Sequence, residues 1–456
     1  MGHTQRFREG RYLTDRNMAA VRNPDGRPKK PAMKKEKEYP AKDPGEAAEN
    51  AGSMFGILYD RLMDSMEFHR DLSDEEIFQK IDGLLSGPNC PVRLADRTRL
   101  RMELFNSVRR LDILQELIDD DSITEVMVNG TDGIYFERNG MLQRWPGNFG
   151  TREKLIDIAG QIVASCNRVV NEASPIVDAR LANGARVNIV MPPVAVDGPI
   201  ITIRRFPDHP IGLQELLSWG SITEEAAAFL RKLVIAGYNI FISGGTGSGK
   251  TTLLNVLTGF IPSDERIITI EDNCELQIQG IDNLVRLEAR AANDEGSHAV
   301  SIRDLIRASL RMRPSRIIVG EVRGEETIDM LQALNTGHDG SLSTGHGNSP
   351  ADMLSRLETM YSMGMALPIS AIRRQIASGI DIMLHLGKIR DRTRKVLEIA
   401  EIDGYDYQTD RILLHSLFEF RETGQDERGK VLGSLAATGK LKSLGKLRRA
   451  GIEVPE

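Results

Sequence analysis

The stretch YNIFISGGTGSGKTTLLNVLTGF (residues 238–260) decides the fold of this chain. An apolar strand pattern, Ile240 to Ser243, runs into a loop of small residues, and the loop runs into a helical pattern with leucines at core spacing. The loop matches the phosphate-loop pattern G-x-x-x-x-G-K-[ST], in the strand, loop and helix context that this pattern requires. The sequence therefore predicts an α/β domain with a parallel sheet and a phosphate-binding loop.

The loop supplies the contacts that the phosphates of a nucleotide need. Its glycines let successive backbone N–H groups turn inward, and the N-terminus of the following helix adds partial positive charge. We expect Lys250 to bridge the β- and γ-phosphates and the Thr251 hydroxyl to bind Mg²⁺, so the predicted ligands are ATP and Mg²⁺. The predicted nucleotide-binding residues are Gly244, Gly245, Thr246, Gly247, Ser248, Gly249, Lys250, Thr251 and Thr252.

A second apolar strand pattern, residues 267–270, ends in an acidic cluster of Glu271, Asp272 and Glu275. The carboxyl ends of parallel strands gather at the edge where the phosphate loop also lies, so these carboxylates should face the γ-phosphate. Hydrolysis requires a carboxylate that polarises an in-line water, and Glu271 is the first candidate for that role. Asp272 and Glu275 have an alternative role, which is to cap the turn that follows.

The stretch PSRIIVGEVRGEE (residues 314–326) predicts another buried strand, and it ends on Gly320 and Glu321 where an aspartate is usual. A glutamate is one carbon longer, so it can reach Mg²⁺ through a water or touch the attacking water directly. The site would then hold two glutamates, Glu271 and Glu321, on neighbouring strands. The sequence leaves open which of them is the base and which organises the metal.

Two histidines, His338 and His346, lie eight residues apart in LNTGHDGSLSTGHGNSP (residues 334–350). Metal ligation would need a third ligand at suitable spacing, and the sequence offers none. An imidazole that donates a hydrogen bond to the γ-phosphate, and so senses its presence, is the simpler hypothesis. A core histidine is the alternative, and it suits His338 better than His346.

Bulk properties limit the class of protein. The 456 residues, 40% of them hydrophobic, predict two folded domains with extensions. A net charge of −6 gives no overall basic footprint, so we expect no direct contact with nucleic acid. Three scattered cysteines exclude a disulfide framework. Without an apolar run of roughly 18 residues or a secretory signal, the expected location is cytoplasmic, with membrane contact only through partners.

Composition and periodicity divide the chain into six segments. Residues 1–52 are polar and rich in Lys and Arg, which predicts a disordered basic arm. The other predicted segments are a small helical bundle (53–120), an α+β N-terminal domain (121–207), a linker with a short helix (208–222), an ATPase domain of alternating strands and helices (223–421) and a C-terminal tail (422–456).

Local signals predict particular elements within these segments. Ser73 and Glu76 form a capping box at the start of one helix, and a third helix should run from about residue 95 to 119. A further helix is expected over residues 151–169, followed by two strands within residues 178–206.

Four ordered motifs carry a resemblance to a known family: GGTGSGKT (244–251), ITIEDNCEL (268–276), RIIVGEVRG (316–324) and TGHDGSLSTGH (336–346). Together they resemble the secretion ATPase superfamily of type II and type IV secretion and pilus machines. Within that superfamily, SITEVMVNG, NGARVNI, IRRF and LRMRPSRIIVGEVRGEE are similar to the CpaF-like ATPases of tight-adherence (Tad) pili. The resemblance covers residues 55–420.

The resemblance implies a RecA-like C-terminal ATPase domain in a homo-hexameric ring, with each nucleotide site between that domain and the N-terminal domain. It implies that Glu271 is the candidate base and that His346 with His338 forms a histidine box. Glu321 would be the atypical acid of the Walker B strand and a metal-site residue, because this superfamily carries glutamate where many other phosphate-loop enzymes carry aspartate.

Arginines of the N-terminal domain are expected to complete the site. Arg186, and Arg204 or Arg205, match the family's positions, and an arginine finger contributes roughly 10³ to 10⁵ in rate in other phosphate-loop enzymes. The alternative for each is a surface arginine at a strand end. The predicted catalytic residues are Glu271, Glu321, His346, His338, Arg186 and Arg204.

The function that the resemblance implies is an ATP-hydrolysing motor for assembly of a Tad-type type IV pilus at the inner membrane, with retraction left open. Inner-membrane platform proteins would be direct partners, and pilin an indirect one. One alternative is a type IV secretion ATPase that moves DNA or protein effectors. Another is a ring scaffold that binds nucleotide without hydrolysing it. A small GTPase is disfavoured because no N-K-x-D motif occurs.

Overall fold

The computed structural model describes residues 47–66, 72–87, 92–138, 140–164, 166, 170–205, 210–290, 299–427 and 429–453. The chain divides into two compact units, Met1–Gly56 and Ile57–Glu456. Most of the predicted basic arm lies outside the described residues, and helix α1 (Ala47–Ser65) begins before residue 53. Among the described helices, none is long and apolar enough to cross a membrane.

Helix α2 (Asp74–Ser86) starts at the predicted capping box, which is confirmed. The Glu76 N–H donates to the Ser73 hydroxyl at 3.3 Å, and the Ser73 N–H donates to the Glu76 carboxylate at 2.9 Å. These two bonds satisfy backbone donors that the first turn of a helix leaves without partners. Phe78 of α2 then stacks on Phe105 with ring centroids 4.1 Å apart, which joins α2 to the next helix.

The single helix predicted over residues 95–119 is two helices, so that prediction is wrong. Helix α3 (Leu94–Arg109) ends first, and α4 (Leu114–Ile118) begins after a break. Asp112 lies in the break with a φ of 50°. An L-residue in this left-handed conformation cannot continue a right-handed helix.

The first sheet has six antiparallel strands in the order β3-β2-β1-β6-β5-β4. Three strands, rather than the predicted two, follow helix α5 (Arg152–Ala164), because a hairpin closes between Leu181 and Ala185. The strands are β1 (Ile123–Asn129), β2 (Gly133–Arg138), β3 (Met141–Arg144), β4 (Ile176–Arg180), β5 (Arg186–Val190) and β6 (Ile200–Arg204).

The residues of β4, β5 and β6 alternate between a buried and a more exposed face, as strands of an antiparallel sheet with one covered face do, whereas the edge strand β3 is exposed along its length. On β5, Val187 and Ile189 are buried, whereas Arg186 and Asn188 are on the opposite face. The buried face also contains Val126, Val128, Ile201 and Ile203.

The second sheet has nine strands in the order β15-β14-β13-β12-β7-β11-β10-β8-β9. The run from β12 to β9 is parallel, and β13 to β15 add antiparallel strands at one side. The strands are β7 (Ile240–Gly244), β8 (Ile267–Glu271), β9 (Leu284–Glu288), β10 (Arg316–Val319), β11 (Leu342–Gly345), β12 (Ile382–Lys388), β13 (Arg394–Asp406), β14 (Arg411–Gln425) and β15 (Val431–Ala437).

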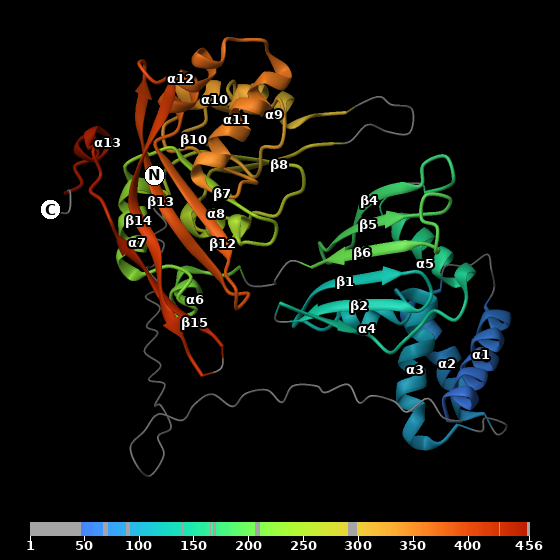
Figure 1. Ribbon diagram of the computed structural model, residues 1–456. Helices are drawn as coiled ribbons and strands as arrows, with labels where there is room; N and C mark the ends of the chain where they lie inside the picture. The colour runs from blue at the N-terminus through green and yellow to red at the C-terminus, as the bar shows by residue number, and fades with distance from the viewer. Residues whose placement is uncertain are drawn as a thin grey trace, which may run out of the picture. The chain divides into compact units, whose positions relative to one another are not determined.

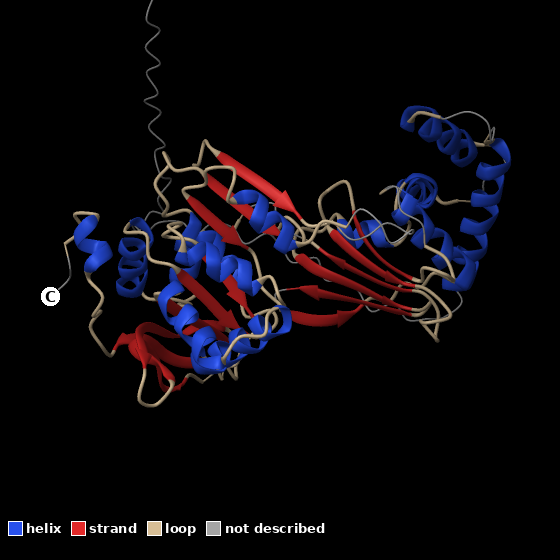
Figure 2. Ribbon diagram, turned by 90° about the horizontal axis from the view of Figure 1, so that it is seen from above, coloured by secondary structure: helices blue, strands red, loops and turns tan. Residues whose placement is uncertain are grey.

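Helices cover both faces of the parallel strands, as Figures 1 and 2 show. All of β7 is buried: Ile240 and Ile242 belong to the apolar cluster with α7 and α8, and Phe241 to the cluster on the other face. This two-sided burial explains the unbroken apolar run of the strand. The helices are α6 (Leu213–Ser218), α7 (Glu224–Ile235), α8 (Lys250–Thr258), α9 (Ile302–Ser309), α10 (Thr327–Asn335), α11 (Pro350–Gly364) and α12 (Ile369–Gly379).

The α/β fold with a RecA-like strand order is as expected. β11 separates the phosphate-loop strand β7 from β10, and β10 pairs directly with β8. The two strands that end in glutamates are therefore neighbours, as the sequence predicted.

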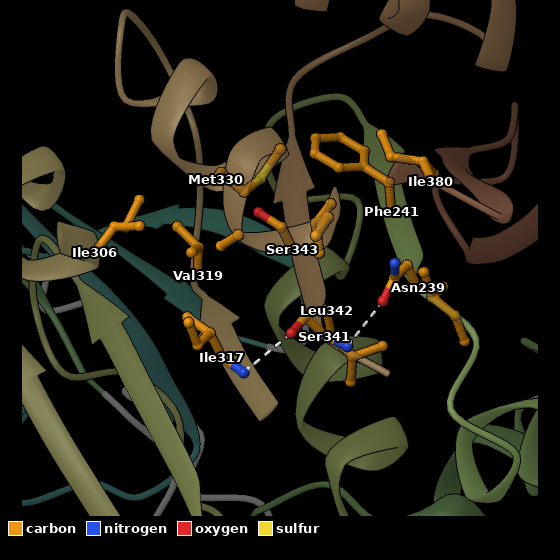
Figure 3. A pocket seen from close by; sticks show the side chains of 13 residues that line it. Asn239, Phe241, Ile306, Ile317, Val319, Met330, Ser341, Leu342, Ser343 and Ile380 are labelled. Atoms are coloured by element: carbon orange, nitrogen blue, oxygen red, sulfur yellow. Dashed lines mark hydrogen bonds between the residues drawn. The ribbon is translucent and has the colours of Figure 1, made fainter. Parts of the chain in front are cut away.

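A small cavity lies on one face of the nine-stranded sheet, between its strands and the helices α9 and α10 (Figure 3). Its volume is about 10 Å³, and apolar side chains such as Phe241 and Met330 make up most of its lining. That volume is near the least that holds one water, so the cavity is not a nucleotide site.

The large sheet continues past residue 421, where the sequence analysis ended the ATPase domain. The rest of β14, all of β15 and the short helix α13 (Gly445–Arg449) follow. Glu401 of β13 is 1% exposed, and its carboxylate accepts hydrogen bonds from the backbone N–H groups of Lys442 and Ser443 at 2.8 and 2.7 Å. Leu447 of α13 is buried in the same apolar cluster as β7.

Replacing Glu401 should detach this C-terminal segment. Glu401→Ala removes both acceptors and leaves two backbone donors without them, so the free energy of unfolding should fall by about 2–3 kcal/mol. Urea denaturation measures this, and hydrogen exchange should speed up in residues 440–450. Glu419→Ala, an exposed position on the neighbouring strand, is the control. Equal stability of the two variants would contradict the docking role of Glu401.

Candidate functional site

The phosphate loop has a conformation that only glycine adopts readily. Gly247 and Gly249 have φ angles of 65° and 99°, and Gly249 immediately precedes α8. A Cβ atom on Gly244 would lie 2.5 Å from the backbone oxygen of Leu386 on the adjacent strand. These glycines therefore allow the sharp curl that turns backbone N–H groups inward.

Polar atoms of the loop fit a site for phosphate groups. The Ser248 hydroxyl is buried and has no hydrogen-bond partner among the described residues. The ammonium group of Lys250 turns back on the loop and donates to the backbone oxygens of Gly244 and Gly245 at 3.1 and 3.3 Å. Burial lowers the pKa of Lys250, and the charge of Glu321 opposes that shift. An anion in the curl would supply a partner for both side chains.

Lys250, His346 and Glu321 form a chain of contacts beside the loop. The Lys250 ammonium lies 3.2 Å from Nδ1 of His346, and Nε2 of His346 lies 2.8 Å from Glu321 Oε1. Because an ammonium group can only donate, Nδ1 accepts, and Nε2 carries the proton of the neutral ring where it lies against Glu321. Burial lowers the pKa of His346, which agrees with a neutral imidazole in this position.

Arg323 is a member of this cluster that the sequence analysis missed. Its guanidinium donates to Glu321 Oε2 at 2.8 Å, and this hydrogen bond raises the pKa of Arg323. The same guanidinium lies 3.9 Å from Asp272. The only sequence signal was the basic residue two positions after Glu321, which is too common a pattern to predict a contact.

Glu271 is buried, and the backbone holds it in place. Its Oε2 accepts from the N–H groups of Glu275 and Leu276 at 2.9 and 3.0 Å, whereas its Oε1 is buried without a hydrogen-bond partner among the described residues. Burial raises the pKa of Glu271 to about 7, although the two N–H donors act in the other direction. The turn-capping role that the sequence offered to Asp272 and Glu275 is therefore performed by Glu271.

Gly320 explains why the second acidic strand ends in Gly-Glu. The Gly320 N–H donates to the Ile270 oxygen at 2.9 Å, so this residue lies beside Glu271 on the neighbouring strand. A Cβ atom at position 320 would lie 2.9 Å from the Cγ atom of Glu271, closer than real contacts of this kind. The glycine gives Glu271 room to lie across the strand end, and Glu321 follows it directly.

The structure places the two histidines at opposite ends of β11. His346 follows the strand at the phosphate-loop edge, whereas His338 precedes it, with Nδ1 3.2 Å from the backbone oxygen of Ala333. Four strand residues span roughly 13 Å at about 3.3 Å per residue. The structure does not bring His338 to the phosphate loop, so only His346 remains in the candidate site.

The predicted arginines lie together on the solvated face of the first sheet. Arg186 of β5 is directly opposite Arg204 of β6 in the register, and Arg180 of β4 is directly opposite Arg186. Arg204 also faces Glu125 of β1, with 3.9 Å between Nε and Oε1. Like charges that face each other across strands destabilise a sheet, so this row fits a surface that binds an anion.

Arg205, the alternative to Arg204, has a structural role. Its guanidinium donates to the carboxylate of Asp121 at 3.0 Å and to the backbone oxygen of Asp120. Its side chain is 11% exposed, against 50% for Arg204. Arg204 is therefore the better candidate for contact with a ligand.

The donor set for a metal ion is incomplete without a nucleotide. Within the described part of the chain, no three His, Cys, Asp or Glu side chains converge to hold a metal ion. Mg²⁺ usually takes one or two protein oxygens together with phosphate oxygens and waters. The Thr251 hydroxyl in the first turn of α8 and the Glu321 carboxylate are donors of the right chemistry.

The raised pKa of Glu271 predicts how stability depends on pH. The folded chain retains a proton between the ordinary pKa of 4.5 and about 7, whereas the unfolded chain loses it, so this group destabilises the fold as pH rises through that interval. Glu271→Gln cannot ionise and keeps an acceptor for the two N–H groups. It should gain about 1–3 kcal/mol over the wild type between about pH 5 and pH 8, measured by urea denaturation. A pH-independent difference would contradict the assignment.

Comparisons with known proteins place the chain among its relatives. The model of the family described as type II/IV secretion system protein matches residues 108–402. A putative conjugal transfer protein of Mycobacterium tuberculosis is 37% identical over 294 residues, which is 63% of this chain and 83% of that protein. The type IV secretion system protein PtlH of Bordetella pertussis is 34% identical over 321 residues, which is 64% of this chain and 94% of that protein.

Among solved structures, the crystal structure of the VirB11 ATPase of the Brucella suis type IV secretion system is similar. It is 30% identical, with a TM-score of 0.36, over 63% of this chain and 92% of that chain. The family match includes the phosphate loop, both glutamates and His346, and it extends over more than half of the sequence. The chain therefore belongs to the type II/IV secretion system protein family.

Proposed function

We propose that this protein is an ATP-hydrolysing motor that assembles a Tad-type type IV pilus, and that it works as a homo-hexamer at the cytoplasmic face of the inner membrane. The contact chain from Lys250 through His346 to Glu321 is the observation that carries the hydrolytic part of this proposal. It connects the cation of the phosphate loop, through the histidine that follows β11, to the acid that follows β10. Membership of the secretion system family supports the motor part.

In this proposal, nucleotide binding rearranges the contact chain. The terminal phosphates of ATP outcompete the backbone oxygens of the loop for Lys250, because a phosphate group carries full negative charge. His346 then loses its donor at Nδ1 and is free to reorient toward the γ-phosphate. The state of the γ-phosphate is thereby transmitted to Glu321, which His346 contacts through Nε2.

The two glutamates receive different roles. Glu321 is partly exposed, contacts His346 and Arg323, and lies where it can accept a proton from an attacking water. Glu271 is held by two backbone donors, and its pKa of about 7 suits an acid that retains or releases a proton near neutral pH. We assign Glu321 to the water and the metal site, and we assign Glu271 the role of a buried carboxyl group that holds or releases a proton at the neighbouring strand end.

Bound Mg²⁺ would neutralise phosphate charge and orient the phosphate oxygens. The residues that would hold it are Thr251 and Glu321.

The arginine row contributes positive charge to the same reaction. Arg186 and Arg204 are directly opposite each other in the register, and a transferring phosphoryl group is an anion that would be attracted to both charges. We propose that they reach the nucleotide when the N-terminal and ATPase domains close around it. The resulting rigid-body motion would drive the membrane platform proteins, which in turn move pilin.

A second candidate function is supported by the names of two relatives. One is described as a conjugal transfer protein and one as a type IV secretion system protein, so transport of DNA or protein effectors is the alternative. Neighbouring genes discriminate between the two functions: small pilins with a prepilin peptidase favour the pilus, and a relaxase favours DNA transfer.

Two substitutions test the hydrolytic site. Lys250→Ala removes the phosphate-binding ammonium, and Glu321→Gln removes the negative charge that polarises water, so each should lower ATP hydrolysis by about 10²-fold or more. A phosphate-release assay on the full-length protein measures this. Glu419→Gln, which makes the same chemical change on a distant strand, should hydrolyse ATP like the wild type. Near-normal turnover by either site variant would refute the assignment, and no hydrolysis by the wild type would favour a scaffold.

The arginine row gives a separate prediction. Arg186→Ala should lower ATP hydrolysis about tenfold or more, while the free energy of unfolding changes by no more than about 0.5 kcal/mol, because the register opposite Arg204 is unfavourable and the ion pair with Glu275, at 4.0 Å, is weak. Arg144→Ala, on β3 of the same sheet, is the control and should leave hydrolysis unchanged. A structural arginine would show the opposite result for Arg186→Ala, with lower stability and normal hydrolysis.

A further inference from the structure

The hairpin that joins β12 to β13 lies against the phosphate loop. Arg394, the first residue of β13, donates from Nε to the backbone oxygen of Gly247 at 2.8 Å. Lys388, the last residue of β12, is next to the same glycine, because a Cβ atom on Gly247 would lie 3.1 Å from its ammonium nitrogen. β12 pairs with β7 up to the contact of Leu386 with Gly244, so the hairpin emerges beside the loop (Figure 1).

Arg394 also covers the second glycine of the loop that has a positive φ. A Cβ atom on Gly249 would lie 3.8 Å from the Cδ atom of Arg394. Gly247 and Gly249 both have a positive φ, and because glycine adopts either sign of φ at similar cost, their backbone is free to turn unless a contact fixes it. The hydrogen bond from Arg394 fixes the Gly247 carbonyl group, and it therefore also restricts the peptide units on either side of that group. The N–H groups of the curl are then held in the inward orientation that an anion requires.

The hairpin is itself held in place by strands β14 and β15, which together form the C-terminal ribbon. Asp391 in the turn accepts from the Thr393 N–H and hydroxyl at 2.9 and 2.6 Å, which closes the turn. Its other carboxylate oxygen accepts from the Val431 N–H at 2.8 Å, at the start of β15. Arg390 of the same turn pairs with Glu422 of β14. The contact between Arg394 and the loop is therefore supported from the ribbon side.

We propose that residues 388–394 are part of the nucleotide site, with Arg394 as a positioning residue of the phosphate loop and Lys388 as a second ammonium group for the phosphates. This inference rests on the proposed nucleotide-binding function of the loop. Lys250 and Lys388 would approach the bound phosphates from different strands, β7 with its helix and β12. The exposed side chain of Lys388 gives it the freedom to turn from Gly247 to a phosphate oxygen.

The first test measures nucleotide binding rather than turnover. Fluorescence titration of the full-length protein with an N-methylanthraniloyl derivative of ADP, in the presence of Mg²⁺, gives the dissociation constant. Arg394→Ala should raise it about tenfold, and Lys388→Ala about three- to tenfold, as expected for the loss of one interaction with a charged group. Arg231→Ala removes the same charge from an exposed position of α7, outside the hairpin and the loop, so it should bind like the wild type.

The second test separates the loss of the positive charge at position 388 from loss of the fold. Lys388→Arg should restore binding to within about twofold of the wild type, whereas Lys388→Met should not, because only the charge is required. In ATP hydrolysis, Lys388→Ala should raise KM with kcat within about twofold, since its effect is on binding. Urea denaturation of all variants checks that the fold is intact.

Lys250→Ala distinguishes failure of this inference from failure of the proposed function. If the wild type binds the ADP derivative, Lys250→Ala does not, and Arg394→Ala and Lys388→Ala both bind like the wild type, the hairpin inference is overturned and the nucleotide site stands. If the wild type and Lys250→Ala both fail to bind, the proposed function itself is overturned.

Discussion

The parallel pairing of β7, β11, β10 and β8 is the constraint on which the site depends. Parallel strands end at the same edge, so the backbone bonds of one sheet bring the phosphate loop, His346, Glu321 and Glu271 to one place although nearly a hundred residues separate them. The apolar clusters on the two faces make that edge rigid, because every residue of β7, β8 and β10 is buried. The chemistry is then set by the side chains at or just after the end of each strand.

The two glutamates differ in burial, and therefore in their hydrogen-bond partners and their chemistry. Glu271 is buried at the end of β8, where one of its oxygens accepts hydrogen bonds from two backbone N–H groups. Its pKa is raised because a buried carboxylate loses its hydration. Glu321 lies one position beyond Gly320, nearer to solvent, where one of its oxygens accepts a hydrogen bond from Arg323 and the other lies 2.8 Å from Nε2 of His346. A single missing Cβ atom at position 320 permits both arrangements at once.

Positive charge is distributed over several elements around this edge. Lys250 and Arg323 lie within the ATPase core, Lys388 and Arg394 are in the hairpin beside the loop, and a row of arginines crosses the first sheet. These groups are scattered along the sequence, and the net charge of the chain, −6, gives no sign of them. The C-terminal ribbon takes part in this arrangement through the turn of the hairpin.

The sequence by itself determined the phosphate loop, the α/β class, the two acidic strand ends and the resemblance to secretion ATPases, because each depends on a local pattern of residue types. It could not decide the break at Asp112, since a single left-handed residue leaves helical periodicity almost unchanged. Only the tertiary structure separated His338 from His346, gave the capping role to Glu271 and placed Arg394 on Gly247. Each of these three placements depends on strand pairing and on burial. The spacing of residues along the chain encodes neither the pairing nor the burial.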